Sequence, residues 1–280
     1  MPASEIILNP DQSVYHLHLK NGEVPQKVIT VGDPDRIDWI APHFDFIEFD
    51  RSFREFRSLK GRIGSAEILV ISTGIGTDNI DIVLNELHLA YAWDLERREP
   101  FKEERPAIEL IRLGTSGTLR EDIPLDSILQ SEGALGFDYL MYFYQWPEFH
   151  TVKELKAFPD PYLAMGSEQL RSRFKGQADF HGITVTADGF YGPQGRSLPL
   201  PARQPQWLEI LANQEVQGYP VTNLEMETAG IYALGRLLNM ECLSLSAILA
   251  NRRKQEFSKN PEAILKAMIA SALERFSAPH

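Results

Sequence analysis

The stretch that decides the fold is Lys27-Val28-Ile29-Thr30-Val31, followed at once by Gly32-Asp33-Pro34-Asp35-Arg36. The first half is an apolar, β-branched run and predicts a buried strand. The second half predicts a turn into a helix, with Pro34 near the first helical position. On its own this turn favours a solvated Arg36. The alternative is a phosphate site, because amide N–H groups at a helix start beside an arginine suit an anion.

The same alternation of short apolar runs and helix-length segments continues along the chain. Further strands are expected at Ile68–Ser72, Ile108–Leu113, Ile183–Ala187 and Leu243–Ala250. Helices are expected at Asn79–Ala92, Met226–Leu238 and Pro261–Phe276. This alternation predicts an α/β layered fold with a largely buried sheet. Ligand sites in such folds gather at the carboxyl ends of the strands.

No internal repeat or low-complexity linker divides the sequence. Two polar or aromatic stretches, Glu96–Arg105 and Phe137–Phe158, are interpreted as surface insertions or partner-facing loops and not as domain boundaries. We therefore expect one domain over residues 1–280.

The overall charge and the cysteine content narrow the classes of function. With a formal net charge of −11, generic binding to nucleic acid or to an anionic membrane is not expected. Any bound anion must be held by a local cluster of arginines. Cys242 is the only cysteine, which excludes an internal disulfide framework and a zinc thiolate site. Because the sequence shows neither a secretory signal nor a membrane-spanning stretch, we expect a cytoplasmic protein.

An arginine at the end of an expected strand points to an anion. The sequence there is Arg112-Leu113-Gly114-Thr115-Ser116-Gly117, and a buried strand rarely carries an arginine without an anionic partner. Arg36, Arg112 and the Thr115 hydroxyl are expected to converge on one tetrahedral anion. The glycine-rich segment Ser72–Asn79 lets a backbone approach a ligand, but it has neither the dinucleotide fingerprint nor a Walker lysine.

Two further motifs suit a sugar and a flat ring. In Asn223-Leu224-Glu225-Met226-Glu227, one glutamate is explained by helix capping. A second one suggests a carboxylate that accepts two ribose hydroxyls, with the methionine as an apolar floor. In Phe190–Arg196 an aromatic ring, a carboxamide and a guanidinium occur within one short loop, which is the set that a heterocycle needs.

Metal and nucleophile chemistry lack support in the sequence. The histidines show no metal-binding spacing, and there is no Gly-x-Ser-x-Gly elbow or partnered thiolate. We therefore expect no metal and no covalent enzyme intermediate.

These motifs, taken in this order, resemble those of the nucleoside phosphorylases, the family of purine and uridine phosphorylases. The resemblance runs from about Tyr15 to the C-terminal helix and is carried by GDPDR, FREF with STGIG, IRLGTSG, FYGPQGR, NLEMETAG and Asn251-Arg252. FYGPQGR is most similar to the uridine branch, in which Phe, Gln and Arg recognise uracil. The resemblance implies a single-domain layered α/β fold with a central mixed β-sheet flanked by helices.

The resemblance also implies a role for each matching residue. The phosphate site would comprise Gly32, Arg36, Arg112 and Thr115, with Arg54 lent by a neighbouring subunit. Ribose would contact Glu225, Met226 and Glu227, with His16 reaching across from the neighbour. The base would contact Phe190, Gln194, Arg196 and Arg252. The expected catalytic residues are Arg112, Gln194, Arg196 and Glu227, and sites shared in this way imply a homo-oligomer.

The implied chemistry needs no cofactor, because inorganic phosphate is the nucleophile. Cleavage of the bond between ribose C1′ and the base passes through an oxocarbenium-like state, and C1′ inverts. The base leaves with negative charge that Arg196 and Gln194 can stabilise. Much of the remaining catalysis would be the alignment of the two bound reactants.

We expect the base to be uracil, and alternative substrates and activities stay open. Gln194 can accept from a ring N–H and donate to an oxo group, while Arg196 demands an oxo acceptor and should reject cytosine. Hypoxanthine offers the same edge, so a purine nucleoside phosphorylase or a hydrolytic nucleosidase of the same fold stays open, as does a non-catalytic nucleoside-binding protein. The bacterial purine branch carries a Ser-Asp general acid after its last long strand. Here LSLSAILANRR ends in Asn251-Arg252 without an aspartate, which favours uridine.

One departure from the family pattern concerns a monovalent cation. The glycine loop continues with Thr77-Asp78-Asn79, where many bacterial relatives have Gly-Pro-Ser. Some relatives bind potassium between subunits through that Ser and the Glu that follows the FREF arginine, here Glu55. Because Asn79 takes the Ser position, the sequence argues against a potassium site.

Overall fold

The computed structural model describes residues 1–2, 4–153 and 160–279. Its strands are β1 (Lys27–Val31), β2 (Phe46–Phe53), β3 (Phe56–Ile63), β4 (Ala66–Ser72), β5 (Trp93–Asp94), β6 (Glu99–Pro100), β7 (Ile108–Thr118), β8 (Ile128–Gly136), β9 (Tyr162–Met165), β10 (Phe180–Thr186), β11 (Glu215–Val216), β12 (Tyr219–Glu225), β13 (Met240–Asn251) and β14 (Glu256–Phe257). Its α-helices are α1 (Arg36–Ile40), α2 (Thr77–Ala92), α3 (Glu168–Arg173), α4 (Trp207–Ala212), α5 (Thr228–Leu237) and α6 (Pro261–Ser277). Short 3-10 turns are η1 (Ala41–His43), η2 (Leu140–Phe143) and η4 (Gly192–Gln194).

Most strands belong to one mixed sheet that closes partly on itself. Its order is β11-β12-β10-β8-β13-β7-β1-β4-β3-β2, with β14 beside β13 and β9 beside β8. β7 lies parallel to β1 and β13, and β10 lies parallel to β8 and β12. β12 also pairs antiparallel with β7, through Asn223 with Thr118 and Leu224 with Gly117. This extra pairing brings the carboxyl ends of β7 and β12 together.

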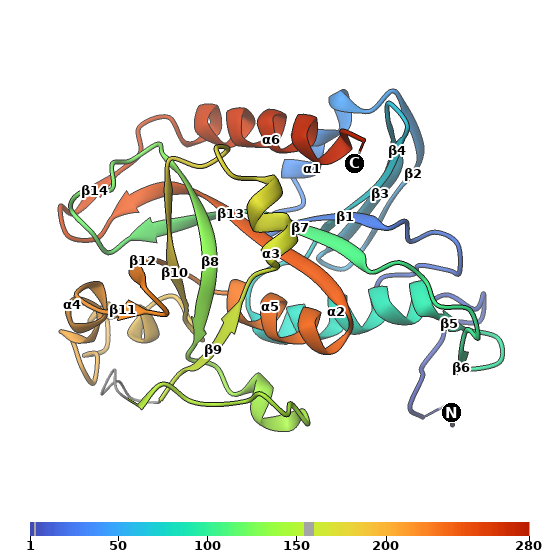
Figure 1. The fold of residues 1–280 in the computed structure, drawn as a ribbon, viewed down its shortest axis with the longest axis horizontal. Coiled ribbons are helices and arrows are strands. Elements are labelled where there is room, and N and C mark those ends of the chain that lie inside the picture. Colours follow the sequence, from blue (N-terminus) through green and yellow to red (C-terminus); the bar gives the residue numbers. More distant parts are fainter. Residues whose placement is uncertain (3, 154–159, 280) are drawn as a thin grey trace.

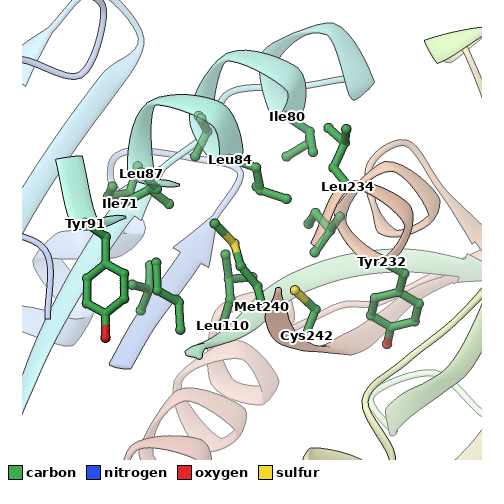
Figure 2. Close-up of a cluster of buried hydrophobic side chains, with 14 of the residues drawn as sticks. Ile71, Ile80, Leu84, Leu87, Tyr91, Leu110, Tyr232, Leu234, Met240 and Cys242 are labelled. Carbon is green, nitrogen blue, oxygen red and sulfur yellow. The ribbon is translucent and has the colours of Figure 1, made fainter. Parts of the chain in front are cut away.

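Helices cover both faces of the sheet (Figure 1). On one face, α2 and α5 pack on the side chains of Val28, Leu69 and Leu110. On the other, α1 and α6 pack on their strand neighbours, which point the opposite way. Figure 2 shows the first of these layers, where Ile80, Leu84 and Leu87 of α2 lie with Leu110 in one buried cluster. No helix in the described ranges is long and apolar enough to cross a membrane.

The α/β fold with a central mixed sheet and flanking helices is confirmed. All strands and helices expected from the apolar runs are present, with ends that differ by a few residues. β2, β3 and β8 were not predicted. β8 carries Gln130, Ser131 and Glu132 among its apolar residues. These polar side chains are buried and form hydrogen bonds with one another or with distant residues, which a local sequence pattern cannot reveal. Tertiary context thus overrides strand propensity in β8.

The prediction of a surface insertion at Phe137–Phe158 is wrong for its first part. Phe137, Asp138 and Met141 are buried, and Phe137 packs edge-on against Trp207 of α4. The aromatic residues that suggested a partner-facing loop are partly used inside the subunit. Residues 154–158 of this stretch lie outside the described residues. Glu96–Arg105 contains β6, which pairs with β5 in a small hairpin.

Candidate active site

The site lies where the carboxyl ends of β1, β7, β10 and β12 approach one another. Arg112 of β7 is 5% exposed, and its Nη2 lies 2.6 Å from Glu227 Oε2 and 3.0 Å from Glu225 Oε2. Its Nη1 donates to the hydroxyls of Ser244 and Ser246 on β13. Burial opposes the charge on Arg112, but the two carboxylates outweigh it and raise the pKa of the guanidinium. The sequence predicted an anionic substrate as the partner of this buried arginine. Among the described residues its anionic partners are these two carboxylates, and the binding of an anionic substrate by Arg112 stays a prediction.

Gly114 makes room for this guanidinium. A Cβ at Gly114 would lie 1.8 Å from Arg112 Nη1, so the arginine folds back over the glycine two residues further along β7. This role of Gly114 was not predicted from the sequence. A glycine two positions after an arginine in a strand is visible in the sequence, but this spacing does not indicate the direction in which the arginine side chain turns.

Arg36 lies beside Arg112. It follows the turn after β1, and its Nη1 donates to the carbonyl oxygen of Leu113 at 3.3 Å. Burial and then the positive charge of Arg112 lower the pKa of Arg36. Two guanidiniums held close together, one half-buried (Arg36) and one buried (Arg112), are an arrangement that an anion stabilises. Thr115, also half-buried, follows on β7, and Gly32 begins the turn that carries Arg36. The structure therefore brings the expected residues Gly32, Arg36, Arg112 and Thr115 to one end of the sheet.

Glu227 joins the strand ends to the start of α2. Its Oε1 accepts the N–H of Gly76 at 2.8 Å, while its Oε2 contacts Arg112. Burial raises the pKa of Glu227, as does the neighbouring Glu225, and Arg112 lowers it. Gly76 has a φ of 97°, which favours glycine and turns this N–H toward the carboxylate. The link between the glycine-rich loop and Glu227 was not foreseen, because the two lie 151 residues apart.

Glu225 and Met226 complete the loop between β12 and α5. Met226 is half-buried between the two glutamates. Glu225 Oε2 accepts the N–H groups of Glu227 and Thr228 at 3.0 Å each. These bonds cap α5, and they explain why the helix begins at Thr228 and not at the predicted Met226.

The predicted base residues form a second group. Arg196 donates from Nη1 to Gln194 Oε1 at 2.8 Å and to the carbonyl oxygen of Phe190. Its guanidinium lies 3.8 Å from the centre of the Phe190 ring. Arg252 Nη2 donates to the carbonyl oxygen of Gln194 at 3.1 Å, while the Nη1 of Arg252 is buried and has no partner among the described residues. Burial and then the charge of Arg252 lower the pKa of Arg196. These contacts bring Phe190, Gln194, Arg196 and Arg252 together.

Arg252 connects this base group to β7. A Cβ at Gly117 would lie 3.6 Å from Arg252 Cγ, so the arginine passes over the end of β7. The neighbouring Asn251 is a turn residue. Its Nδ2 donates to the carbonyl oxygens of Arg120 and Ile123, and its Oδ1 accepts the N–H groups of Arg253 and Lys254. Asn251 thus stabilises the turn, and it offers no acidic group at the end of β13.

His16 and Arg54 lie apart from both groups, in a surface patch that we call the Tyr15 patch (Tyr15, His16, Phe53 and Arg54). Arg54 is in the two-residue turn between β2 and β3, where its guanidinium lies 5.9 Å from the Tyr15 ring. His16 Nδ1 lies 2.6 Å from Glu86 Oε1 of α2, which leaves Nε2 for another partner. Glu86 also accepts the N–H groups of His16 and Leu17. No contact within the described residues joins Arg54 to Arg112 or Glu227.

The residues named for potassium lie near each other without forming an oxygen cage. A Cβ at Gly74 would lie 2.6 Å from Asn79 Nδ2 and 3.4 Å from Glu55 Cγ. Asn79 directs its amide nitrogen to the carbonyl oxygen of Ile75, whereas an alkali or alkaline-earth cation requires oxygen ligands. Among the described residues, no group of three or more His, Cys, Asp or Glu side chains could hold a metal ion. The absence of a potassium site stays a prediction.

Comparison with known proteins gives consistent results. The chain is 28% identical over 248 residues to a uridine phosphorylase of Thermococcus kodakarensis, with 89% of this chain and 81% of the relative covered. It is 24% identical over 237 residues to a DeoD-type purine nucleoside phosphorylase of Oceanobacillus iheyensis, with 83% and 85% covered. A crystal structure of a Trypanosoma brucei nucleoside phosphorylase, described as showing uridine phosphorylase activity, superposes with a TM-score of 0.86 at 27% identity and covers 97% of this chain and 99% of that chain.

Structures of lower identity support the fold alone. A Toxoplasma gondii purine nucleoside phosphorylase superposes with a TM-score of 0.72 at 18% identity, covering 97% of this chain and 98% of that one.

The family model of the phosphorylase superfamily matches residues 26–277, which include every strand of the sheet and both groups of site residues. The chain belongs to the phosphorylase superfamily.

Proposed function

We propose that this protein is a nucleoside phosphorylase that cleaves uridine with inorganic phosphate to give uracil and ribose 1-phosphate. The observation that carries the proposal is the pair of neighbouring guanidiniums, Arg36 and Arg112, beside the buried carboxylate of Glu227. Phosphate requires cations, which the two guanidiniums supply. The ribose diol requires a hydrogen-bond acceptor, which the carboxylate supplies. The relatives named as uridine phosphorylases support the same assignment.

Phosphate binding changes the partners of Arg112. Arg112 already contacts Glu225 and Glu227, so phosphate must share or take over part of this guanidinium. If phosphate takes over the contact between Arg112 and Glu227 and the contact to Glu225 persists, Glu227 keeps the N–H of Gly76 on Oε1 and its Oε2 becomes available to the ribose 2′- and 3′-hydroxyls. Glu227, together with the Met226 side chain, is thus the proposed ribose site.

The base group is suited to a leaving anion. Arg196 and Arg252 lie close enough for Arg252 to lower the pKa of Arg196, and Nη1 of Arg252 lacks a partner among the described residues. As the bond from C1′ breaks, negative charge spreads over the oxo groups of uracil, and these guanidiniums with the Gln194 amide stabilise it. Phosphate attacks C1′ from the opposite face, so C1′ inverts and no enzyme nucleophile is needed.

The preference for a pyrimidine rests on Gln194, Arg196 and the end of β13. Asn251 is held in a turn by both ends of its amide, and it cannot protonate a purine as an aspartate would. Hypoxanthine still offers the same oxo and N–H edge, and purine nucleoside phosphorylases are among the relatives. Inosine is therefore the principal competing substrate.

We also propose that active sites are shared between subunits of a homo-oligomer. Within one chain the charges of Arg36 and Arg112 are balanced by Glu225 and Glu227, and Asp33 lies near enough to raise the pKa of Arg36. A phosphate dianion needs further positive charge there. Arg54 is exposed in the Tyr15 patch and pairs with no carboxylate among the described residues. Arg54 of a second copy is the proposed source of that charge, and His16 Nε2 the proposed contact to the ribose 5′-hydroxyl.

The decisive experiment is a phosphate-dependent activity panel. The purified protein is incubated with uridine, thymidine, inosine, adenosine or cytidine, with and without inorganic phosphate, and base release is followed by absorbance or chromatography. We expect uracil and ribose 1-phosphate from uridine only when phosphate is present. Equal release in phosphate-free buffer would contradict a phosphorylase, and faster turnover of inosine would contradict the pyrimidine assignment. Calorimetric binding of uridine without turnover would favour a non-catalytic binding protein.

A further inference from the structure

The carboxylate of Glu225 has no room for a ribose hydroxyl. Its Oε1 accepts the hydroxyl of Thr186 at 2.7 Å and the N–H of Thr228 at 3.1 Å. Its Oε2 accepts the N–H groups of Glu227 and Thr228 and a hydrogen from Arg112 Nη2, each at 3.0 Å. A carboxylate offers about four lone-pair sites, and these donors fill them. Glu225 is therefore a hub within the protein and not a contact to substrate.

Thr186 is the side chain that fixes this hub from a different strand. It is the last residue of β10 and is completely buried. Its Oγ1 accepts the N–H of Ala229 at 2.9 Å. A threonine hydroxyl has one proton to donate, and with Ala229 occupying an acceptor position that proton is directed to Glu225 Oε1. The orientation of the Thr186 hydroxyl is therefore set by the first turn of α5.

The fixed carboxylate in turn places two groups that the proposed reaction uses. Arg112 Nη2 lies between Glu225 and Glu227, so a rotation of the Glu225 carboxylate moves the guanidinium meant for phosphate. The N–H of Glu227 also binds Glu225, so the same rotation moves the backbone that carries the ribose carboxylate. The three strands β10, β12 and β7 contribute one residue each to this chain of contacts.

We propose that Thr186 is a positioning residue that holds Glu225, and through it Arg112 and Glu227, in the geometry needed for phosphate and ribose. This inference rests on the phosphate-dependent cleavage proposed above. Thr186 touches neither reactant, and its effect is expected mainly in the use of phosphate, because Arg112, the proposed phosphate-binding group, donates directly to Glu225.

Thr186→Val is the informative variant, because it removes the hydroxyl and keeps the shape. Thr186→Ser restores a hydroxyl at the same position and should rescue the variant. The matched control is Thr30→Val on β1, which pairs with β7 at Arg112. Thr30 is 1% exposed, and its Oγ1 has no hydrogen-bond partner among the described residues. The control thus makes the same substitution in a buried central strand without breaking a bond.

The measurement is kcat and KM for phosphate at saturating nucleoside, together with the rise in Tm that inorganic phosphate produces in each intact protein. For Thr186→Val we expect kcat/KM for phosphate to fall about 10- to 100-fold with a raised KM, because a small misplacement of reacting groups has effects of this size. The phosphate-induced rise in Tm should shrink in parallel. Thr186→Ser should return to within about 3-fold of wild type, well short of the misplacement effect, and Thr30→Val should behave as wild type.

A loss of folded protein alone would lower kcat and leave KM for phosphate unchanged, and that result would overturn the proposal. So would a Thr186→Val variant that matches Thr30→Val, or a Thr186→Ser variant that fails to recover. If the wild-type protein does not cleave nucleosides but its Tm rises with phosphate, the proposed reaction fails. The Tm series then still tests whether Thr186 positions the phosphate-binding arginine.

Discussion

At the scale of single residues, the site depends on where one guanidinium is held. Arg112 lies in the interior with carboxylates on one side, serine hydroxyls on the other, and a glycine beneath it. A buried arginine with these partners is held in one orientation, because turning away from the carboxylates would leave its charge buried and uncompensated. The same orientation sets which atoms of Arg112 remain for the proposed phosphate.

Gly114→Ala tests this packing directly. The new Cβ would lie 1.8 Å from Arg112 Nη1, so the guanidinium must leave its place between the carboxylates. We expect kcat/KM for phosphate to fall by about 100-fold or more. Gly117→Ala on the same strand is the control, because its Cβ would meet its nearest neighbours at an ordinary 3.6 Å. Steady-state kinetics with phosphate varied decide the matter, and equal behaviour of the two variants would refute the packing argument.

Arg196→Ala tests the base end. The side chain contacts Gln194 and lies over the Phe190 ring, so its loss removes an oxo-specific donor and a charge that stabilises the leaving base. We expect kcat/KM for uridine to fall by about 100-fold and the preference for uridine over cytidine to shrink. Activity on both nucleosides should be compared with that of Arg203→Ala, an arginine of the same loop outside the assigned base group. Unchanged discrimination in Arg196→Ala would remove Arg196 from the base site.

At the scale of secondary structure, β8 shows how buried polar groups hold elements together. Glu132 contacts Arg171 of α3 at 2.6 Å, His181 of β10 at 2.9 Å and Gln130 of its own strand. Burial raises the pKa of Glu132. The hydrogen bonds from Gln130, His181 and Arg171 outweigh burial and hold the pKa below the ordinary value of 4.5. This cluster ties α3 to the sheet away from the proposed reaction.

Glu132→Gln is expected to destabilise the protein in a way that depends on pH. A carboxyl group whose pKa is lower in the folded state adds stability above its unfolded pKa, and this stability is lost as the pH falls through the folded pKa. The variant should thus cost about 1.5–3 kcal/mol at pH 7, the range for hydrogen bonds to charged groups, and less below pH 4.5. Urea denaturation at both pH values measures this. Glu168→Gln, at an exposed position of α3, should change stability little, and a pH-independent cost for Glu132→Gln would contradict the electrostatic explanation.

At the scale of the whole molecule, the two site groups belong to one chain, while the Tyr15 patch faces outward from it. Tyr15 and Phe53 are 40% and 37% exposed, and His18 stacks on Phe53 with ring centres 3.6 Å apart. An exposed aromatic surface that carries an arginine without a carboxylate partner among the described residues is suited to a partner with an anionic site. A second copy of this chain is the proposed partner, with the proposed phosphate near Arg36 and Arg112 as its anionic site.

Mixing two inactive variants tests whether sites are shared. Arg54→Ala and Arg112→Ala should each lose most activity as homo-oligomers. If two subunits share their sites as a pair, co-expression gives mixed pairs in which one site combines the intact Arg112 of one subunit with the intact Arg54 of the other. Random pairing should restore about a quarter of wild-type activity, since half the pairs are mixed and each has one complete site. No recovery in a verified mixed oligomer would contradict sharing, and co-expressing Arg112→Ala with itself is the control.

Much of the fold could be predicted, and candidate site residues could be named, because both depend on local signals. The apolar runs of β1, β4, β7 and β13 and the periodicity of α2 and α6 are visible in short windows. The motifs at strand ends name Arg36, Arg112, Glu227 and Arg196 without any structure. β8 and the buried start of Phe137–Phe158 could not be predicted, because their polar or aromatic residues find partners far away in the chain.

The sequence by itself determined the fold class and the residue types at the ends of the strands. Only the tertiary structure decided how those residues pair. Arg112 and Glu227 are 115 residues apart, and they meet because the sheet closes and β12 pairs with the end of β7. That closure makes Glu225 a hub held by Thr186, and it makes the protein's own carboxylates the partners of the buried arginine. Local sequence patterns indicate which side chains lie at the ends of strands, whereas the contacts between those side chains depend on packing across the whole sheet.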